Sequence, residues 1–208
     1  MRNTLKFVAL GIALSAAAPV IAQQSADGNW LVRGRAVQLD YSNGQADNMQ
    51  ANVGKVEASD RWIPEVDISY FFTKNIAAEL VLTYPQDVDI KINGTKQGTI
   101  GALPPSLLVQ YHFTDLGAFK PYVGAGVNYT FFSKRSNILN GAARVDRDSF
   151  GLAAQVGLDY ALTKNWSLNF DVKYVQMNTD VTLTASGTKV GKVNLDPMLY
   201  GIGVGYRF

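Results

Sequence analysis

Charged residues recur at two-residue spacing inside segments that are otherwise apolar. Arg33 lies two residues before Arg35, and the same spacing separates Asp171 from Lys173. In an extended strand, residues two apart point to the same side. Charges enclosed on such a face must be paired and hydrogen-bonded, which favours a structural plug of salt bridges over a proton or ion relay. The set comprises Arg33, Arg35, Glu65, Asp67, Glu79, Asp159, Asp171, Lys173 and Arg207.

Residues for bond-making chemistry are scarce. His112 is the sole histidine and cysteine is absent, so neither a zinc cluster nor a catalytic triad is predicted. Asp87 and Asp89 could bind calcium, but a solvated acidic loop explains them more simply. Asn93-Gly94 predicts the tip of a hairpin. We therefore expect a protein that is not an enzyme and needs no cofactor or metal.

The elements that would carry the charges are strands, and the last stretch shows this most clearly. From Met198 to Phe208 one face is apolar or aromatic, and the other is mostly glycine. Strict alternation predicts a strand with unlike surroundings on its two sides. Gly201, Gly203 and Gly205 are interpreted as relieving crowding inside a narrow barrel.

Seven further segments alternate in the same way, and the connections between the eight are short and long in turn. Each is about the ten residues that a tilted strand needs to cross a bilayer. The pattern predicts an all-β fold: an eight-stranded antiparallel transmembrane β-barrel with short periplasmic turns and long extracellular loops. The segments are 29–41, 62–72, 76–84, 106–113, 121–132, 149–160, 166–174 and 196–208.

The N-terminal stretch is typical of export. Residues 1–22 combine Arg2 and Lys6 with a short apolar run and small residues before Gln23, which predicts a cleaved signal peptide and leaves 23–208 as the barrel. Without residues 1–22 the chain has 17 basic and 17 acidic residues, so no nucleic-acid partner is implied. Aromatic residues gather at both ends of the outward faces, as expected of membrane-interface belts.

The inward residues nearer the long loops are predominantly apolar. They predict a funnel above the charged plug, suited to a hydrophobic ligand, although they could merely fill space. Eight strands leave no open water pore, so a ligand that enters from outside would leave sideways into the bilayer. Leu103-Pro104-Pro105 could border such an opening or only stiffen a loop. The predicted path residues are Val37, Leu39, Ile63, Leu108, Phe132, Val175, Met177 and Leu199.

Five stretches together resemble the outer membrane protein W family, which includes AlkL-type alkane-uptake proteins. They are ISYFFTKNIAAEL, LPPSLLVQYHF, KPYVGAGVNYTFF, DYALTKNWSLNFDVKY and the terminal GVGYRF. The resemblance implies an outer-membrane barrel with a hydrophobic channel that opens outward and passes small hydrophobic molecules by lateral release. The outer loops 42–61 and 178–196 resemble nothing we can match.

Together these observations predict a bacterial outer-membrane protein that admits small hydrophobic molecules. The alternative is a structural or surface-interaction barrel, in which the loops act as receptor or adhesin and the lumen is inert. The expected partners are outer-membrane lipid, lipopolysaccharide, small hydrophobic molecules and, through Phe208, the barrel-assembly machinery.

Overall fold

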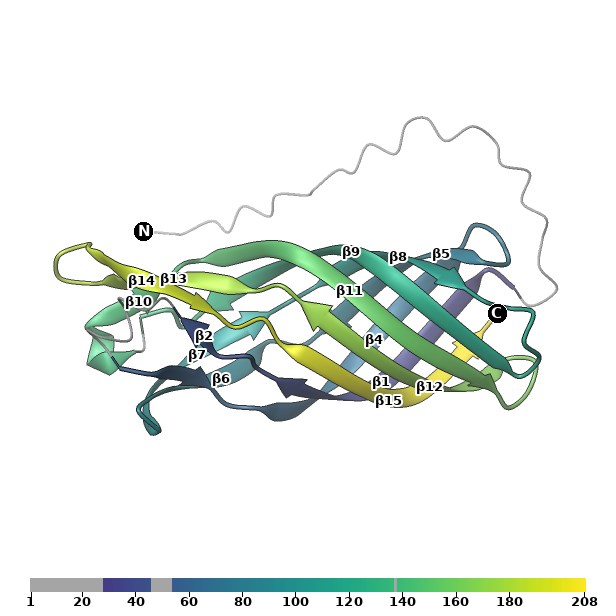
Figure 1. The fold of residues 1–208 in the computed structure, drawn as a ribbon, viewed down its shortest axis with the longest axis horizontal. Coiled ribbons are helices and arrows are strands. Elements are labelled where there is room, and N and C mark those ends of the chain that lie inside the picture. Colours follow the sequence, from purple (N-terminus) through teal and green to yellow (C-terminus); the bar gives the residue numbers. More distant parts are fainter. Residues whose placement is uncertain (1–27, 46–53, 137) are drawn as a thin grey trace, which may run out of the picture.

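The computed structural model describes residues 28–45, 54–136 and 138–208, and the signal peptide expected over 1–22 lies outside them. Eight antiparallel strands form a closed barrel, in the ring order β1-β4-β5-β8-β9-β11-β12-β15 and back to β1 (Figure 1). The predicted barrel is therefore confirmed. Its strands are β1 (Trp30–Asp40), β4 (Arg61–Phe71), β5 (Ile76–Thr83), β8 (Ser106–His112), β9 (Phe119–Ser133), β11 (Asp148–Ala161), β12 (Trp166–Val175) and β15 (Met198–Arg207).

The strand limits differ from the predicted ones by two residues at most. The closing strand begins at Met198 rather than at Asp196, because Asp196 has a φ of 30°, which is not an extended conformation, and Pro197 follows it. The Asp196 side chain instead accepts a hydrogen bond from the Met177 N–H at 2.8 Å. β15 pairs with β1 on one side and with β12 on the other, and these ladders close the barrel.

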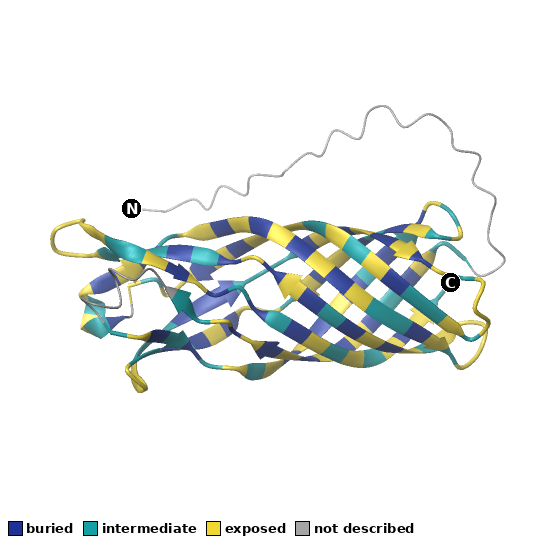
Figure 2. Cartoon of the chain, viewed as in Figure 1, coloured by how far each residue is buried: buried dark blue, intermediate teal, exposed yellow. Residues whose placement is uncertain are grey.

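Buried and exposed residues alternate along the barrel strands (Figure 2). The outward face is apolar and exposed, and the inward face is buried whether its residues are apolar or charged. The aromatic belts also form. At the short-turn end Trp30 packs edge-on against Tyr70, and the ring centres of Trp166 and Tyr206 lie 4.9 Å apart. Exposed rings at the opposite end include Tyr84, Phe131, Phe150 and Tyr200.

The long connections are not plain loops. They form further strands that extend the wall beyond the barrel (Figure 1), and we call these the extension strands. β7 continues alongside β9, while β10, β13, β14 and β2 form a separate four-stranded sheet. Apolar and polar residues alternate less regularly in these segments than in the barrel strands, so the sequence pattern predicts loops there. They are β2 (Gly44–Gln45), β3 (Val56–Ala58), β6 (Gln86–Ile92), β7 (Thr95–Leu103), β10 (Ala143–Val145), β13 (Asn178–Leu183) and β14 (Lys189–Asn194).

In the described ranges, helix is confined to the short 3-10 turn η1 (Leu139–Gly141). None of their helices has the length and apolar character needed to span a membrane.

Two of the short turns have the same sequence and the same geometry. In both Thr-Lys-Asn turns the threonine hydroxyl accepts hydrogen bonds from the N–H groups two and three residues later. The distances are 3.2 and 3.0 Å at Thr73 and the same at Thr163. The asparagine that follows donates to the end of a neighbouring strand: Asn75 to His112 O at 2.7 Å and Asn165 to Arg207 O at 2.6 Å. The turn sequence therefore also fixes the adjacent strand end.

Candidate ligand path through the barrel lumen

Arg33 lies at the centre of the charged layer. β1 directs it into the lumen, where its side chain is fully buried. Its guanidinium binds Asp159 at two points, with Nε–Oδ1 at 3.0 Å and Nη2–Oδ2 at 2.6 Å. Nη1 lies 3.0 Å from Asp67 and 3.4 Å from Glu79. One arginine thus joins strands β1, β4, β5 and β11, which is why the layer acts as a cross-brace of the barrel.

Arg35 and Lys173 extend this layer toward the long loops. Arg35 Nη2 lies 2.7 Å from Asp67 and 3.0 Å from Glu65, and its Nη1 lies 3.2 Å from Asp171. Lys173 Nζ lies 3.2 Å from Glu65 Oε1, at the side of the network nearer the long loops. These contacts cross from β1 to β4 and β12, so eight of the nine charges predicted to form a plug meet in one network.

Neutral groups satisfy much of the remaining hydrogen-bonding capacity. The Tyr122 hydroxyl donates to Asp171 at 3.1 Å, Asn169 donates to Asp159 at 2.9 Å, and Gln155 donates to Glu79 at 2.8 Å. Within the network as described, five carboxylates face three cations, and all eight residues are at most 5% exposed. The sequence reading missed Tyr122, because it lies beside Pro121 at the start of β9, where the alternation is weakest.

Arg207, which the sequence also assigns to the plug, has its described side-chain contacts at the short-turn side of the network. It lies at the short-turn end, with its guanidinium carbon 3.9 Å from the centre of the Phe71 ring and its Nε donating to Gly28 O at 3.0 Å. Arg207 is also half-buried, whereas the network residues are buried. The reason is position: Arg207 is the last residue of β15 and pairs with Leu31, two residues before Arg33 on the neighbouring strand. His112, likewise at that end, contacts Gln110 at 2.9 Å.

The eight residues predicted to line the upper lumen are all buried and belong to a single hydrophobic cluster. They come from β1, β4, β8, β9, β12 and β15 and from the link after β12. The structure adds partners from the extension strands, from β5 and β11 and from the links between strands. The added members are Tyr41, Val56, Ala58, Val81, Val88, Ile90, Ile100, Ala102, Ile138, Ala143, Val145, Ala153, Val181, Val193 and Leu195.

Two cavities lie within this cluster. The outer one, of about 30 Å³, is enclosed by extension strands and is apolar except for Thr179. The inner one, of about 10 Å³, has Leu199 and Met177 on its wall and the Glu65–Lys173 pair among its lining residues. Because the charged network bounds the inner cavity, the apolar region ends where the charged layer begins. We call this apolar region the vestibule.

The barrel wall is interrupted beside the inner cavity. Backbone pairs join β5 to β8 as far as Val81 and Ser106, and pairs between β6 and β7 resume at Gln86 and Ala102. In the described ladders, the intervening stretches carry no pair with each other. They are residues 82–85 and 103–105, and we call this interruption the wall break.

Pro104 accounts for the wall break. Pro105 directs its carbonyl toward β9, where it accepts from the Tyr129 N–H at 3.1 Å. Successive residues of a strand direct their backbone groups to opposite neighbours, so Pro104 faces the break. Proline has no N–H to donate there, and Pro85 in the facing stretch has none either. Pro104 and Thr83 both line the inner cavity, so the vestibule reaches the wall at this point.

The acidic pair in the long connection is engaged by lysines. Asp87 contacts Lys134 at 2.6 Å, and Asp89 contacts Lys96 at 2.7 Å and Thr99 at 2.9 Å. The hydrogen bond from Lys96, followed by that from Thr99, lowers the pKa of Asp89 below its ordinary value. The two aspartates therefore lie in strand β6 and not in a plain loop, and lysines pair with both carboxylates.

The hairpin predicted at Asn93-Gly94 is confirmed. Asn93 has a φ of 49° and Gly94 a φ of 78°, the positive values that a type I′ turn requires, and the two residues connect β6 to β7.

The sequence and the fold are similar to those of known outer-membrane proteins. The model of the OmpW family matches residues 26–208. Outer membrane protein W of Vibrio cholerae is 34% identical over the full length of both chains. The crystal structure of OprG from Pseudomonas aeruginosa superposes with a TM-score of 0.73 at 28% identity, covering 87% of this chain and 96% of OprG.

AlkL is similar in sequence and in structure. Outer membrane protein AlkL of Ectopseudomonas oleovorans is 35% identical over 68% of this chain and 64% of its own length. The structure of AlkL in lipid bilayers gives a TM-score of 0.70 at 26% identity, covering 94% of this chain and 97% of that one. The chain belongs to the OmpW family of bacterial outer-membrane β-barrels.

Proposed function

We propose that the protein admits small hydrophobic molecules from the cell exterior into the vestibule and releases them sideways through the wall break into the outer membrane. The observation that carries this proposal is the continuity of the vestibule: buried apolar side chains extend from the extension strands down to Pro104 and Thr83 at the break. Relatives named AlkL and the resemblance to alkane-uptake proteins support the hydrophobic class of substrate.

The charged network would determine the direction of release. Moving an apolar molecule through it would separate ion pairs that are withdrawn from water, at a cost of several kcal/mol for each ion left unpaired. The wall break presents apolar lipid instead, and none of its three prolines needs a hydrogen-bond partner for its nitrogen. The sideways route is therefore the one of lower energy.

The cavities are small compared with an alkane chain. An apolar ligand would have to displace side chains of the vestibule. These side chains are held by dispersion contacts and not by hydrogen bonds, so moving them breaks no hydrogen bond. Methionine and leucine side chains can adapt to such a guest, and Met177, Leu108 and Leu199 line or join this region.

The test is uptake of a hydrophobic fluorescent probe by vesicles that contain the protein. A carboxylate in the vestibule should prevent binding, because burying it against an apolar guest is unfavourable. We expect Leu108→Asp and Phe132→Asp to reduce protein-dependent uptake at least tenfold. Leu183→Asp is the matched control, since Leu183 is an exposed apolar residue of β13 outside the vestibule. Heat-modifiable gel mobility verifies that each variant is folded.

Equal uptake by wild type, Leu108→Asp and Phe132→Asp would contradict the proposal. The alternative function, a surface receptor or adhesin, would then be the better account, and the extension strands would be the region to test.

A further inference from the structure

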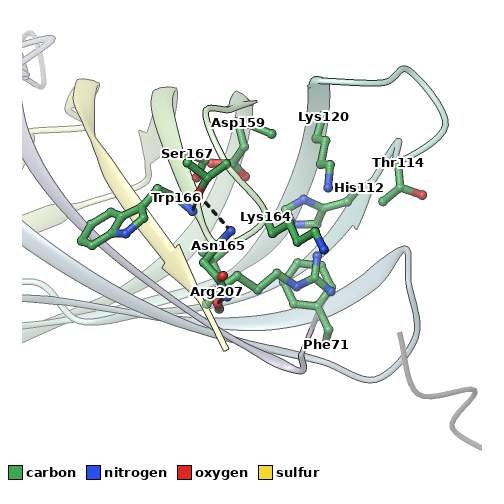
Figure 3. Close-up of a pocket in the computed structure, with 13 residues that line it drawn as sticks. Phe71, His112, Thr114, Lys120, Asp159, Lys164, Asn165, Trp166, Ser167 and Arg207 are labelled. Carbon is green, nitrogen blue, oxygen red and sulfur yellow. Dashed lines mark hydrogen bonds between the residues drawn. The ribbon is translucent and has the colours of Figure 1, made fainter. Parts of the chain in front are cut away.

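A separate cavity of about 40 Å³ lies at the periplasmic mouth of the barrel, beyond the charged network (Figure 3). The ends of β8 and β15, the start of β9 and the turn between β11 and β12 enclose it. His112, Lys120, Lys164 and Arg207 gather around it in the view of Figure 3. A single water needs about 10–15 Å³ on this measure, so the cavity has room for a small polyatomic ion.

The lining of this cavity carries an excess of positive charge. Lys120, Lys164 and Arg207 face it, and among its described lining residues Asp159 alone is acidic. Both oxygens of Asp159 already accept hydrogen bonds from Arg33, at 3.0 and 2.6 Å. Arg33 thus offsets part of the charge of that carboxylate, and the three cations of the lining outnumber it, so the lining favours an anion.

The cationic groups are held in place by the fold. The guanidinium of Arg207 packs on Phe71 and donates to Gly28 O, while Asn165 donates to Arg207 O at 2.6 Å. Thr163 accepts from the N–H groups of Asn165 and Trp166 and so fixes the turn that presents Lys164. A pre-arranged site of this kind loses less entropy on binding than free side chains would.

The two identical turns provide an internal comparison. Lys74, in the first Thr-Lys-Asn turn, lies 3.3 Å from Asp115 and is not part of the cavity lining. Lys164, at the same position of the second turn, lines the cavity. Both lysines are exposed and follow the same local geometry, so what distinguishes them is their surroundings.

We propose that this cavity binds a phosphate group at the periplasmic mouth of the barrel. Phosphate suits three cations better than a carboxylate does, because it carries up to two negative charges and three or more acceptor oxygens. Arg207 supplies a planar donor fork, and the lysines supply compact charges. The site is independent of the proposed hydrophobic path, from which the charged network separates it. The phosphate could belong to a soluble periplasmic compound or to a phospholipid headgroup.

The first arm of the test uses inorganic phosphate. The protein is purified into decyl maltoside, which lacks phosphate, and amide NMR shifts of Asn165 and Ser167 are followed during titration at constant ionic strength. We expect saturable shifts, weakened about three- to tenfold by Lys164→Gln, the change expected from losing one ordinary hydrogen bond at an exposed side chain. Lys74→Gln should leave the affinity unchanged.

The second arm tests the lipid source without free phosphate. Nanodiscs of phosphatidylglycerol are compared with nanodiscs of an uncharged, phosphate-free galactolipid. Shifts of the same amides in phosphatidylglycerol alone, again reduced by Lys164→Gln, would identify a headgroup as the ligand. Saturable shifts with inorganic phosphate alone would identify a soluble ligand.

Absence of saturable shifts in both arms would overturn the proposal. So would equal binding by wild type and Lys164→Gln, or a loss in Lys74→Gln as large as that in Lys164→Gln. Because the probe residues lie outside the vestibule, failure of this site would leave the proposed hydrophobic path untouched, and the reverse also holds.

Discussion

The guanidinium of Arg33 binds the carboxylate of Asp159 at two points across the lumen, between strands β1 and β11 that are not neighbours in the wall. Paired contacts of this kind constrain both distance and orientation. The same arginine contacts Asp67 on β4. The cross-section of the barrel at this height is thus fixed by side chains as well as by the strand ladders.

Replacing Arg33 should therefore be costly. Arg33→Met leaves buried Asp159 without its two-point partner and Asp67 with Arg35 alone, and removing one partner of a buried pair typically costs about 3–5 kcal/mol of unfolding free energy. Urea unfolding in micelles, monitored by tryptophan fluorescence, measures it. Arg207→Met is the control, since Arg207 is half-buried outside the network, and should cost less. A loss of under about 1 kcal/mol for Arg33→Met would be inconsistent with a cross-brace.

The glycine face of β15 makes room for the arginines of β1. A Cβ at Gly203 would collide with Gly34 O and with the backbone and Cγ of Arg35. Gly203→Val should destabilise the barrel by about 1–3 kcal/mol, the usual cost of overpacking. Gly34 on the neighbouring strand has open space where its Cβ would be, so Gly34→Val should unfold at nearly the wild-type urea concentration. Equal effects of the two substitutions would disprove the crowding explanation.

The wall break should depend on Pro104. Pro104→Ala restores an N–H that faces residues 82–85 and permits the β5–β8 ladder to extend across the gap. We expect slower release of the hydrophobic probe, by about threefold or more, with a small gain in stability of up to about 1 kcal/mol. Hydrogen exchange at residues 82–85 reports whether pairing has extended. Extended pairing with unchanged uptake would show that release does not use this gap.

The extracellular Asp89–Lys96 pair gives a defined pH dependence. The folded pKa of Asp89 is lowered, so its stabilising contribution is present above the ordinary aspartate value near pH 4 and is lost as the pH falls through the lowered pKa. The pair is partly exposed, which limits the contribution to about 1 kcal/mol or less. In a carboxyl NMR titration, Lys96→Met should raise the Asp89 pKa. Lys134→Met, which removes the partner of Asp87, should leave it in place, and equal shifts in both variants would refute the assignment.

The barrel and its inward face could be predicted from the sequence, because a strand with lipid on one side and a packed lumen on the other must alternate with period two. Val37, Leu108 and Leu199 are buried in one cluster for that reason. The individual ion pairs could not be predicted, since the contact of Arg33 with Asp159 depends on how far the strands are staggered around the closed barrel.

The sequence pattern could also not predict the extension strands or the contacts of Arg207. β6 and β7 pair through a register shift at Ile90, which disturbs the alternation. Arg207 occupies a strand end, where a neighbouring ring and the Gly28 carbonyl compete with the network for its guanidinium. The Pro104-Pro105 pair signalled the wall break, but which of the two prolines faces it follows only from the hydrogen bond that Pro105 O accepts from Tyr129 in the structure.

The measurement that tests the hydrophobic path most directly compares two solutes of equal size in the same vesicles. Vesicles with an outer leaflet of lipopolysaccharide, which retards hydrophobic molecules, would be prepared with and without the wild-type protein. The vestibule and the charged network together predict faster uptake of the apolar solute when the protein is present and no change for its polar analogue. Uptake of the apolar solute at the rate of empty vesicles, or equal acceleration of both solutes, would contradict the account.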